Sequence, residues 1–101
     1  MAYILQVDFP YQGPWGDEMK EAMEELANSI FHEEGLIWKI WTVNQEKSEA
    51  GGIYLFSDKQ NAGRYLEMHT ERLLKFGIPH VNGKIFEVHN SLSLINHAPI
   101  N

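Results

Sequence analysis

Apolar residues occupy alternate positions near the start of the chain, in the segment YILQVDF from Tyr3 to Phe9. This period of two predicts a β-strand with one apolar face. Two prolines and two glycines in the following segment, PYQGPWG, break the strand and turn the chain. The first element is therefore expected to be a short strand that ends at Phe9.

From Asp17 onward, apolar residues recur at spacings of three and four. That spacing predicts an amphipathic helix, which we expect to end near Glu34 and Gly35. Its apolar positions are Met19, Ala22, Met23, Leu26, Ala27 and Ile30. The glutamates between them are most simply explained as a solvated surface.

The segment GLIWKIWTVN, residues 35–44, has large apolar residues at both odd and even positions. We predict a second strand, in which Trp38 and Trp41 point to opposite faces because successive side chains alternate. Strict alternation places Leu36, Trp38, Ile40 and Thr42 on one face and Ile37, Lys39, Trp41 and Val43 on the other. Both sets are largely apolar, so the sequence does not indicate which face holds a pocket.

A second helix is predicted after the segment AGGIYLF, residues 50–56, whose β-branched and aromatic residues predict the third strand of an antiparallel hairpin. Asp58 is placed to cap this helix, and Gly77 and Pro79 are placed to stop it. Its inward face is expected to carry Ala62, Tyr65, Leu66, His69, Leu73 and Phe76.

The last predicted strand is GKIFEVHN, residues 83–90, and the tail that follows is expected to be tied down through Leu92, Leu94 and Ile95. The resulting order, βαββαβ, predicts a single α+β domain over residues 1–101 with a ferredoxin-like antiparallel sheet and two helices on one face. The other face would be an exposed apolar patch of the kind monomers avoid. We therefore expect a homodimer that packs sheet against sheet.

The composition narrows the possible partners. The formal net charge is −6 and no run of Lys or Arg occurs, which argues against nucleic acid and anionic membranes as partners. The chain has no cysteine, no basic leader at its start and no apolar window of about 18 residues, the length of a membrane span. We expect a cytoplasmic protein that does not enter the membrane.

Five segments, GPWGDEM, GLIWKIWT, EAGGIYLF, YLEMHTERL and NSLSLIN, resemble the putative monooxygenases of the YdhR type, within the dimeric α+β barrel superfamily. The resemblance runs from the first strand to about His97. It implies a dimer whose two sheets form a shared barrel, with a pocket between sheet and helices in each subunit. It also implies a monooxygenase that needs no cofactor, because related barrels oxidise polyketide-like aromatic compounds without metal or flavin.

Cofactor-free oxygenation needs a substrate that can be deprotonated, a dry apolar pocket and a polar group that holds the resulting anion. The predicted catalytic residues are His69, as the base, and Tyr54. The predicted substrate-binding residues are Trp38, Trp41, Tyr65 and Arg72, although only one of the two tryptophans can line the pocket. Each residue has a structural alternative: an aromatic packed in the core, a buried hydrogen-bonded histidine, or a surface or intersubunit ion pair for Arg72.

No metal site is expected, because the five histidines form no pair spaced by four residues. The leading hypothesis is a homodimeric, cofactor-independent monooxygenase that acts on a small aromatic compound between the sheet and the second helix. The alternative is a homodimer that binds a small ligand without turnover. A third possibility is that the aromatic residues only build the dimer core, which would leave no open cavity beside His69.

Overall fold

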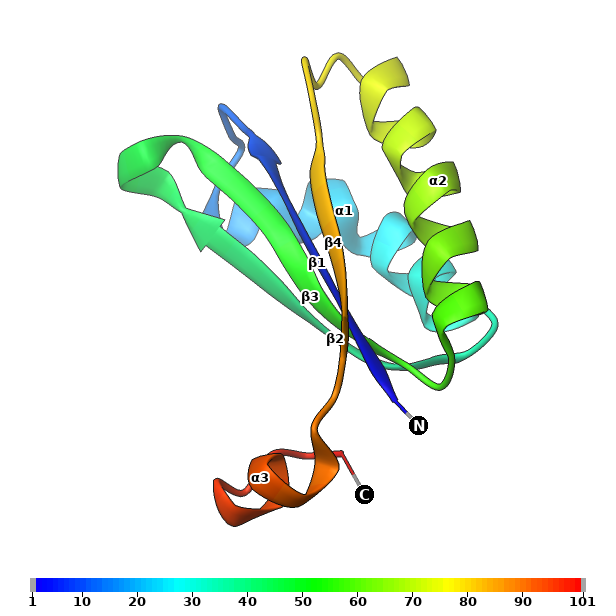
Figure 1. Cartoon of the computed structure of the whole chain (residues 1–101). Helices are drawn as coiled ribbons and strands as arrows, with labels where there is room; N and C mark the ends of the chain where they lie inside the picture. Colours follow the sequence, from blue (N-terminus) through cyan, green and yellow to red (C-terminus); the bar gives the residue numbers. More distant parts are fainter. Residues whose placement is uncertain (1, 101) are drawn as a thin grey trace.

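The computed structural model describes residues 2–100, and its elements follow the predicted order with one helix added at the end (Figure 1). The strands are β1 (Tyr3–Pro10), β2 (Leu36–Asn44), β3 (Glu49–Phe56) and β4 (Asn82–Glu87). The helices are α1 (Gly16–Phe31), α2 (Lys59–Lys75) and α3 (Asn90–Ile95), with a 3-10 turn, η1 (Gln45–Lys47), between β2 and β3. No helix within residues 2–100 is both long and apolar enough to cross a membrane.

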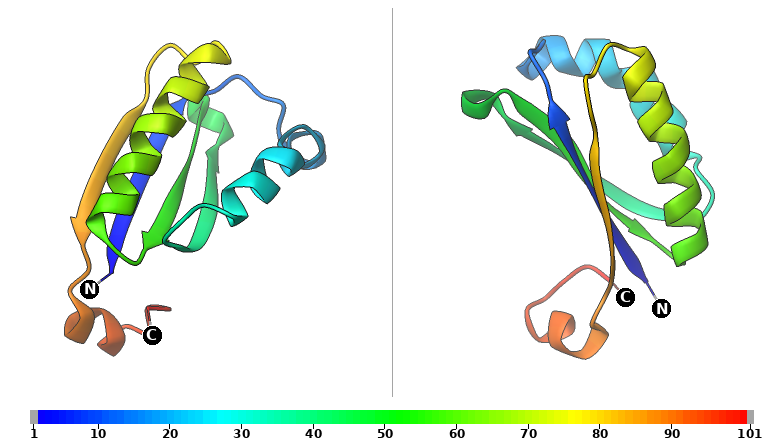
Figure 2. Two further views of the ribbon diagram at one scale, coloured as in Figure 1. Left: turned by 90° about the vertical axis from the view of Figure 1, so that its right-hand side faces the viewer. Right: turned by 45° about the horizontal axis from the view of Figure 1, so that its top comes forward.

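The four strands form one antiparallel sheet in the order β2-β3-β1-β4. Helices α1 and α2 lie on the same face of this sheet, which we call the helix face, and the opposite face is called the open face (Figure 2). The predicted α+β ferredoxin-like fold is therefore confirmed. The sheet of the single chain is open and does not close into a barrel.

The core lies between the helix face and α2. Leu5 of β1 pairs with Tyr54 of β3, and both are almost completely buried. The other fully buried members of this cluster are Val7, Ile30, Phe56, Ala62 and Tyr65. Burying side chains of this size contributes about 1.5 to 3 kcal/mol each, so this cluster is the main source of stability.

Helix α1 stands away from the sheet over most of its length. Ile30, in its last turn, is its one fully buried residue among those described. The helix ends at Phe31 and not near Glu34 as predicted, because residues 32–35 form the turn into β2. Gly35 has a φ of +82°, which favours glycine and which an α-helix does not use.

Strand β2 departs from strict alternation at its start. The register shifts between Leu36 and Trp38, so that Ile37 forms a bulge. As a result Leu36 packs on the core of the helix face, whereas Ile37 is 53% exposed. The predicted face of Leu36 is wrong, but beyond the bulge the alternation holds and Trp38 and Trp41 lie on opposite faces.

Helix α2 follows the prediction except at its end. Asp58 accepts a hydrogen bond from the backbone N–H of Asn61 (2.7 Å), as expected for an N-cap. Its inward residues Tyr65, His69 and Leu73 are buried. Phe76, predicted to face inward, is 71% exposed, because it follows the last helical turn just before Gly77.

The predicted tail is a helix, and its apolar side chains are not tied down. Strand β4 ends at Glu87, and His89 caps α3 by accepting a hydrogen bond from Leu92 N–H (3.3 Å). Leu92, Leu94 and Ile95 are 58%, 48% and 71% exposed. The physical reason is that α3 projects beyond the end of the sheet, where no other helix or strand within residues 2–100 covers it (Figure 1).

Candidate functional site

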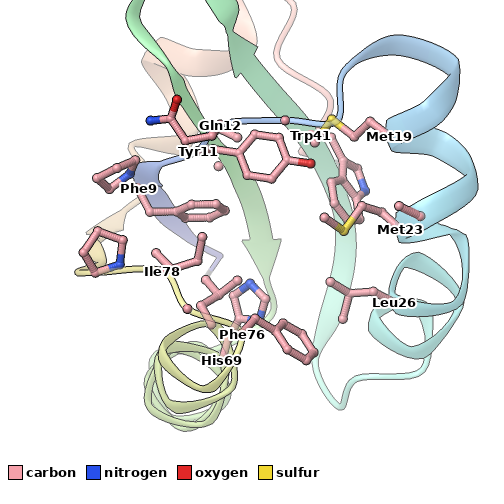
Figure 3. Close-up of a pocket in the computed structure, with 18 of the residues that line it drawn as sticks. Phe9, Tyr11, Gln12, Met19, Met23, Leu26, Trp41, His69, Phe76 and Ile78 are labelled. Carbon is pink, nitrogen blue, oxygen red and sulfur yellow. The ribbon is translucent and has the colours of Figure 1, made fainter.

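A cavity of about 580 Å³ lies between the helix face of the sheet and both helices (Figure 3). Its volume is in the range of small-molecule sites, which is roughly 300 to 1,000 Å³. The residues that line it include Met19, Ala22, Met23, Leu26, Lys39, Trp41, Tyr54, His69 and Phe76. The pocket was expected between the sheet and α2. This expectation is incomplete, because α1 forms one wall of the cavity.

The cavity exists because α1 is held to the core at one end only. Ile30 anchors the last turn, while earlier turns present Met19, Met23 and Leu26 to the open space. Figure 3 shows these three side chains on the α1 side of the cavity, opposite His69 of α2. Methionine is unbranched and adapts to the shape of a ligand, so this wall is suited to a flat apolar molecule.

The floor of the cavity is formed by β2 and β3. Trp41 and Lys39 project from β2 on the helix face, and Lys39 pairs with Tyr54 across the strands. A Cβ atom at Gly52 would lie 2.7 Å from Cε of Lys39. Glycine at this position of β3 therefore leaves room for the lysine stem to lie across the strand.

Three aromatic rings form a contiguous cluster at the edge of the cavity, with one stacked, one tilted and one edge-to-face pair. The rings of Tyr65 and His69 are stacked with centroids 5.0 Å apart, and Tyr54 lies 5.0 Å from Tyr65. The hydroxyl groups of Tyr54 and Tyr65 are hydrogen-bonded to each other at 3.2 Å. Burial raises the pKa of Tyr54 and raises the pKa of Tyr65 to about 12, so both hydroxyl groups stay protonated near neutral pH.

His69 is neutral in this environment. It is only 3% exposed, and Nη2 of Arg72 lies 2.8 Å from its Nδ1 atom. A guanidinium group only donates hydrogen bonds, so Nδ1 is the acceptor and the ring proton is on Nε2. Burial, with the positive charges of Arg72 and Lys39, lowers the pKa of His69 to about 3. The ring can donate a hydrogen bond through Nε2–H, but it is a weak base.

Lys39 is a functional candidate that the sequence analysis did not single out. Its Nζ atom lies 3.5 Å from the centroid of the Trp41 ring and 4.7 Å from that of Tyr54. Burial, together with the charge of Arg72, lowers the pKa of Lys39 to about 7. The available signal was a lysine in an otherwise apolar strand segment.

The charged side chain that lines the cavity is that of Lys39, and Arg72 lies behind His69. None of the described residues that line it is Asp or Glu, although the whole chain has a net charge of −6. Within residues 2–100 the carboxylate ion pairs are Lys20 with Glu24 and Arg64 with Glu34, so Lys39 and Arg72 have no carboxylate partner there. The Nε atom of Arg72 is buried and has no hydrogen-bond partner among residues 2–100.

The structure brings together half of the predicted site. Tyr54, His69 and Trp41 line the cavity, whereas Trp38 lies on the open face and donates a hydrogen bond to the carbonyl of Pro99 (2.9 Å). Tyr65 and Arg72 do not line the cavity and instead contact Tyr54 and His69 from behind. This arrangement therefore does not favour direct contact of Tyr65 or Arg72 with a substrate.

The geometry bears on a metal site and on the possibility that the aromatic residues only build a dimer core. The part of the chain from 2 to 100 contains no group of three or more His, Asp or Glu side chains that could hold a metal ion. The cavity is open to the surface and is lined by His69, which argues against aromatic residues that only build a dimer core.

Comparison with known families gives a match over nearly the whole chain. The family model described as "Putative mono-oxygenase ydhR" matches residues 4–99. No curated protein matches the chain.

Proposed function

Because the chain belongs to the family described as putative mono-oxygenase ydhR, we propose that it is a cofactor-independent mono-oxygenase that acts on a small aromatic compound in the cavity. The observation that carries the proposal is the character of this cavity. Its walls are largely methionine, leucine and aromatic side chains, and its polar groups are limited to a few residues, including Lys39 and His69. An aromatic ligand that fills such a site displaces water from it, and this strengthens the electrostatic interactions within the site.

The proposed chemistry uses the substrate as the source of electrons. A phenol that has lost its hydroxyl proton is electron-rich and reacts with molecular oxygen at a ring carbon. One oxygen atom forms a new carbonyl group, and the other leaves as water with two hydrogens from the substrate, so that a phenol and O₂ give a quinone and water. The protein has to orient the ring, keep water out and hold the anion.

The roles of the candidate residues follow from their positions. Trp41 forms a wall against which a flat ring can stack. The Nε2–H group of His69 is available to donate a hydrogen bond to the substrate oxygen. Arg72 and Tyr65 would act as positioning residues, since they hold His69 and Tyr54 from outside the cavity. This assignment makes His69 a hydrogen-bond donor, in place of the base that the sequence predicted.

We further propose that two chains pair through their open faces. Ile40 on β2 and Phe86 on β4 are 54% and 48% exposed on this face, and the apolar side chains of α3 lie beyond its end. A second copy of the chain is the proposed occupant, because it presents the same apolar surface to the first.

Size-exclusion chromatography with light scattering tests the dimer. We expect a dimer for the unaltered chain and a monomer for Ile40→Lys. Phe31→Lys is the matched control, because Phe31 is 76% exposed at the end of α1 and lies outside the open face. A monomeric unaltered chain, or a dimer that withstands Ile40→Lys, would contradict the proposal.

Oxygen consumption tests the activity. Purified protein, treated to remove metals, is mixed with a panel of hydroxylated naphthalenes and anthrones in an oxygen electrode. The proposal predicts stoichiometric oxygen uptake with at least one compound. The absence of uptake with the whole panel would count against a mono-oxygenase.

One observation favours ligand binding without turnover as the second candidate. The low pKa of His69 removes the histidine as a base, and if no other group takes the proton the cavity would hold its ligand unchanged. This alternative predicts quenching of Trp41 fluorescence by an aromatic ligand that is recovered unaltered. It also predicts little loss of affinity in His69→Ala.

A further inference from the structure

We propose that Lys39 takes the proton from an acidic hydroxyl group on the bound aromatic compound and then pairs with the oxyanion that remains. The ligand class that follows is a small phenol or an aromatic compound with an enolisable carbonyl. This inference rests on the proposed function, because it names the group that prepares the substrate for oxygen.

The position of Lys39 supports this role. Its Nζ atom lies over the ring of Trp41 at 3.5 Å and over that of Tyr54 at 4.7 Å, both of which line the cavity. A flat ligand that packs against Trp41 would bring its hydroxyl group beside this amine. Gly52 leaves the space that the lysine stem occupies.

The groups that face Lys39 leave it without a carboxylate. From α2 the cavity receives His69, with Arg72 behind it, and from β3 it receives the Tyr54 ring. From α1 it receives only uncharged side chains, namely Met19, Ala22, Met23 and Leu26. The connection between β1 and α1 adds Tyr11, whose hydroxyl donates to the carbonyl of Pro14 (2.8 Å). An anionic ligand would supply the counter-charge that these described residues do not provide.

The protonation states of the neighbouring groups agree with this assignment. The pKa of Lys39 is lowered to about 7, so a large part of the lysine is the free amine at neutral pH and can accept a proton. The pKa of His69 is lowered to about 3, and the pKa of Tyr54 is raised. Among these groups, Lys39 is therefore the one whose pKa is matched to proton transfer at neutral pH.

The step itself is a simple proton transfer. The O–H bond of the ligand breaks, an N–H bond forms on Nζ of Lys39, and the electron pair stays on the oxygen. The ammonium group then lies beside the oxyanion, and Nε2–H of His69 is available as a second donor. No oxidant takes part in this step, so it can be measured without turnover.

The test uses 2-naphthol, which like tyrosine is neutral in solution at about pH 8 and which absorbs at longer wavelength when ionised. Binding is followed by absorption under nitrogen, and the protons released are counted by calorimetry in buffers of different ionisation enthalpy. Lys39→Met removes the amine, and Lys39→Arg keeps the positive charge but cannot accept a proton. Lys59→Met, at the exposed start of α2, is the matched control.

We expect the unaltered chain and Lys59→Met to bind naphtholate while releasing about 0.1 proton, since about one tenth of Lys39 is charged at pH 8 when its pKa is about 7. Lys39→Arg should bind naphtholate and release about one proton, because the proton must then go to the buffer. Lys39→Met should bind only neutral naphthol, if at all. Melting curves of each variant establish that it is folded.

Naphtholate bound equally by Lys39→Met, or neutral naphthol or no naphthol bound by the unaltered chain, would overturn the inference. Oxygen uptake by the same samples in air separates this result from the mono-oxygenase proposal. If the chain binds ionised naphthol but consumes no oxygen with any compound of the panel, the role of Lys39 stands and the mono-oxygenase proposal is rejected. If Lys39→Met consumes oxygen at an undiminished rate, the mono-oxygenase proposal stands and the role of Lys39 is rejected.

Discussion

Replacing Lys39 by methionine is expected to stabilise the protein, and by an amount that depends on pH. The folded chain lowers the pKa of this lysine from 10.5 to about 7, chiefly through burial. Between these two values the unfolded chain binds the proton and the folded chain does not. The stability of the unaltered chain should therefore rise as the pH rises from about 7 to about 10.5. Methionine has a similar length and no charge, so it removes this dependence.

The magnitude follows from the two pKa values. One pKa unit corresponds to about 1.4 kcal/mol. The difference between 10.5 and about 7 therefore sets an upper limit of about 5 kcal/mol on the gain in free energy of unfolding below pH 7. The same arithmetic gives a limit of about 2 kcal/mol at pH 9. Because Lys39 is partly exposed and solvent screens its charge, we expect a gain of about 1 to 2 kcal/mol at pH 6.5.

Urea denaturation of both proteins at one protein concentration measures this gain. The advantage of Lys39→Met should shrink from pH 6.5 to pH 9, and Lys59→Met should show no comparable change. A stability difference between Lys39→Met and the unaltered chain that does not change with pH, or a variant less stable than the unaltered chain at pH 6.5, would contradict this prediction. Either result would mean that the amine is not held in an apolar environment.

Three further predictions concern the neighbours of this site. Gly52→Ala should displace the stem of Lys39, since its methyl group would lie 2.7 Å from Cε, and naphtholate absorption should fall while the chain stays folded. Arg72→Met should raise the pKa of His69 above about 3 by removing a nearby positive charge, and an NMR titration of the imidazole measures the change. Tyr65→Phe should cost about 1 to 3 kcal/mol in urea denaturation, because it leaves a buried tyrosine hydroxyl without its partner.

The fold could be predicted from the sequence because its elements have clear periods. The spacing of apolar residues placed four strands and two helices, and the cap at Asp58 fixed the start of α2. The bulge at Ile37 was not predicted, since it depends on the register with β3, which a single strand does not contain. The exposure of α3 was not predicted either, because covering an apolar helix depends on a partner surface.

The candidate site was predicted only in part, for a different reason. His69 and Tyr54 stood out because their side chains carry chemistry and lie on inward positions of α2 and β3. Lys39 did not stand out, because a single lysine in a strand is usually at the surface. Its role depends on α1 standing off the sheet and on the space left by Gly52, and neither follows from periodicity.

The proposed reaction inserts oxygen into an aromatic compound inside the cavity. The most direct measurement is mass spectrometry of the product formed under ¹⁸O₂, with Ala22→Trp to fill the cavity from α1 and Glu21→Trp, at an exposed neighbouring position, as the control. We predict one labelled oxygen in the product and one in water for the unaltered chain and Glu21→Trp, and no product for Ala22→Trp. Unlabelled product, or labelled product at an undiminished rate with Ala22→Trp, would contradict the claim.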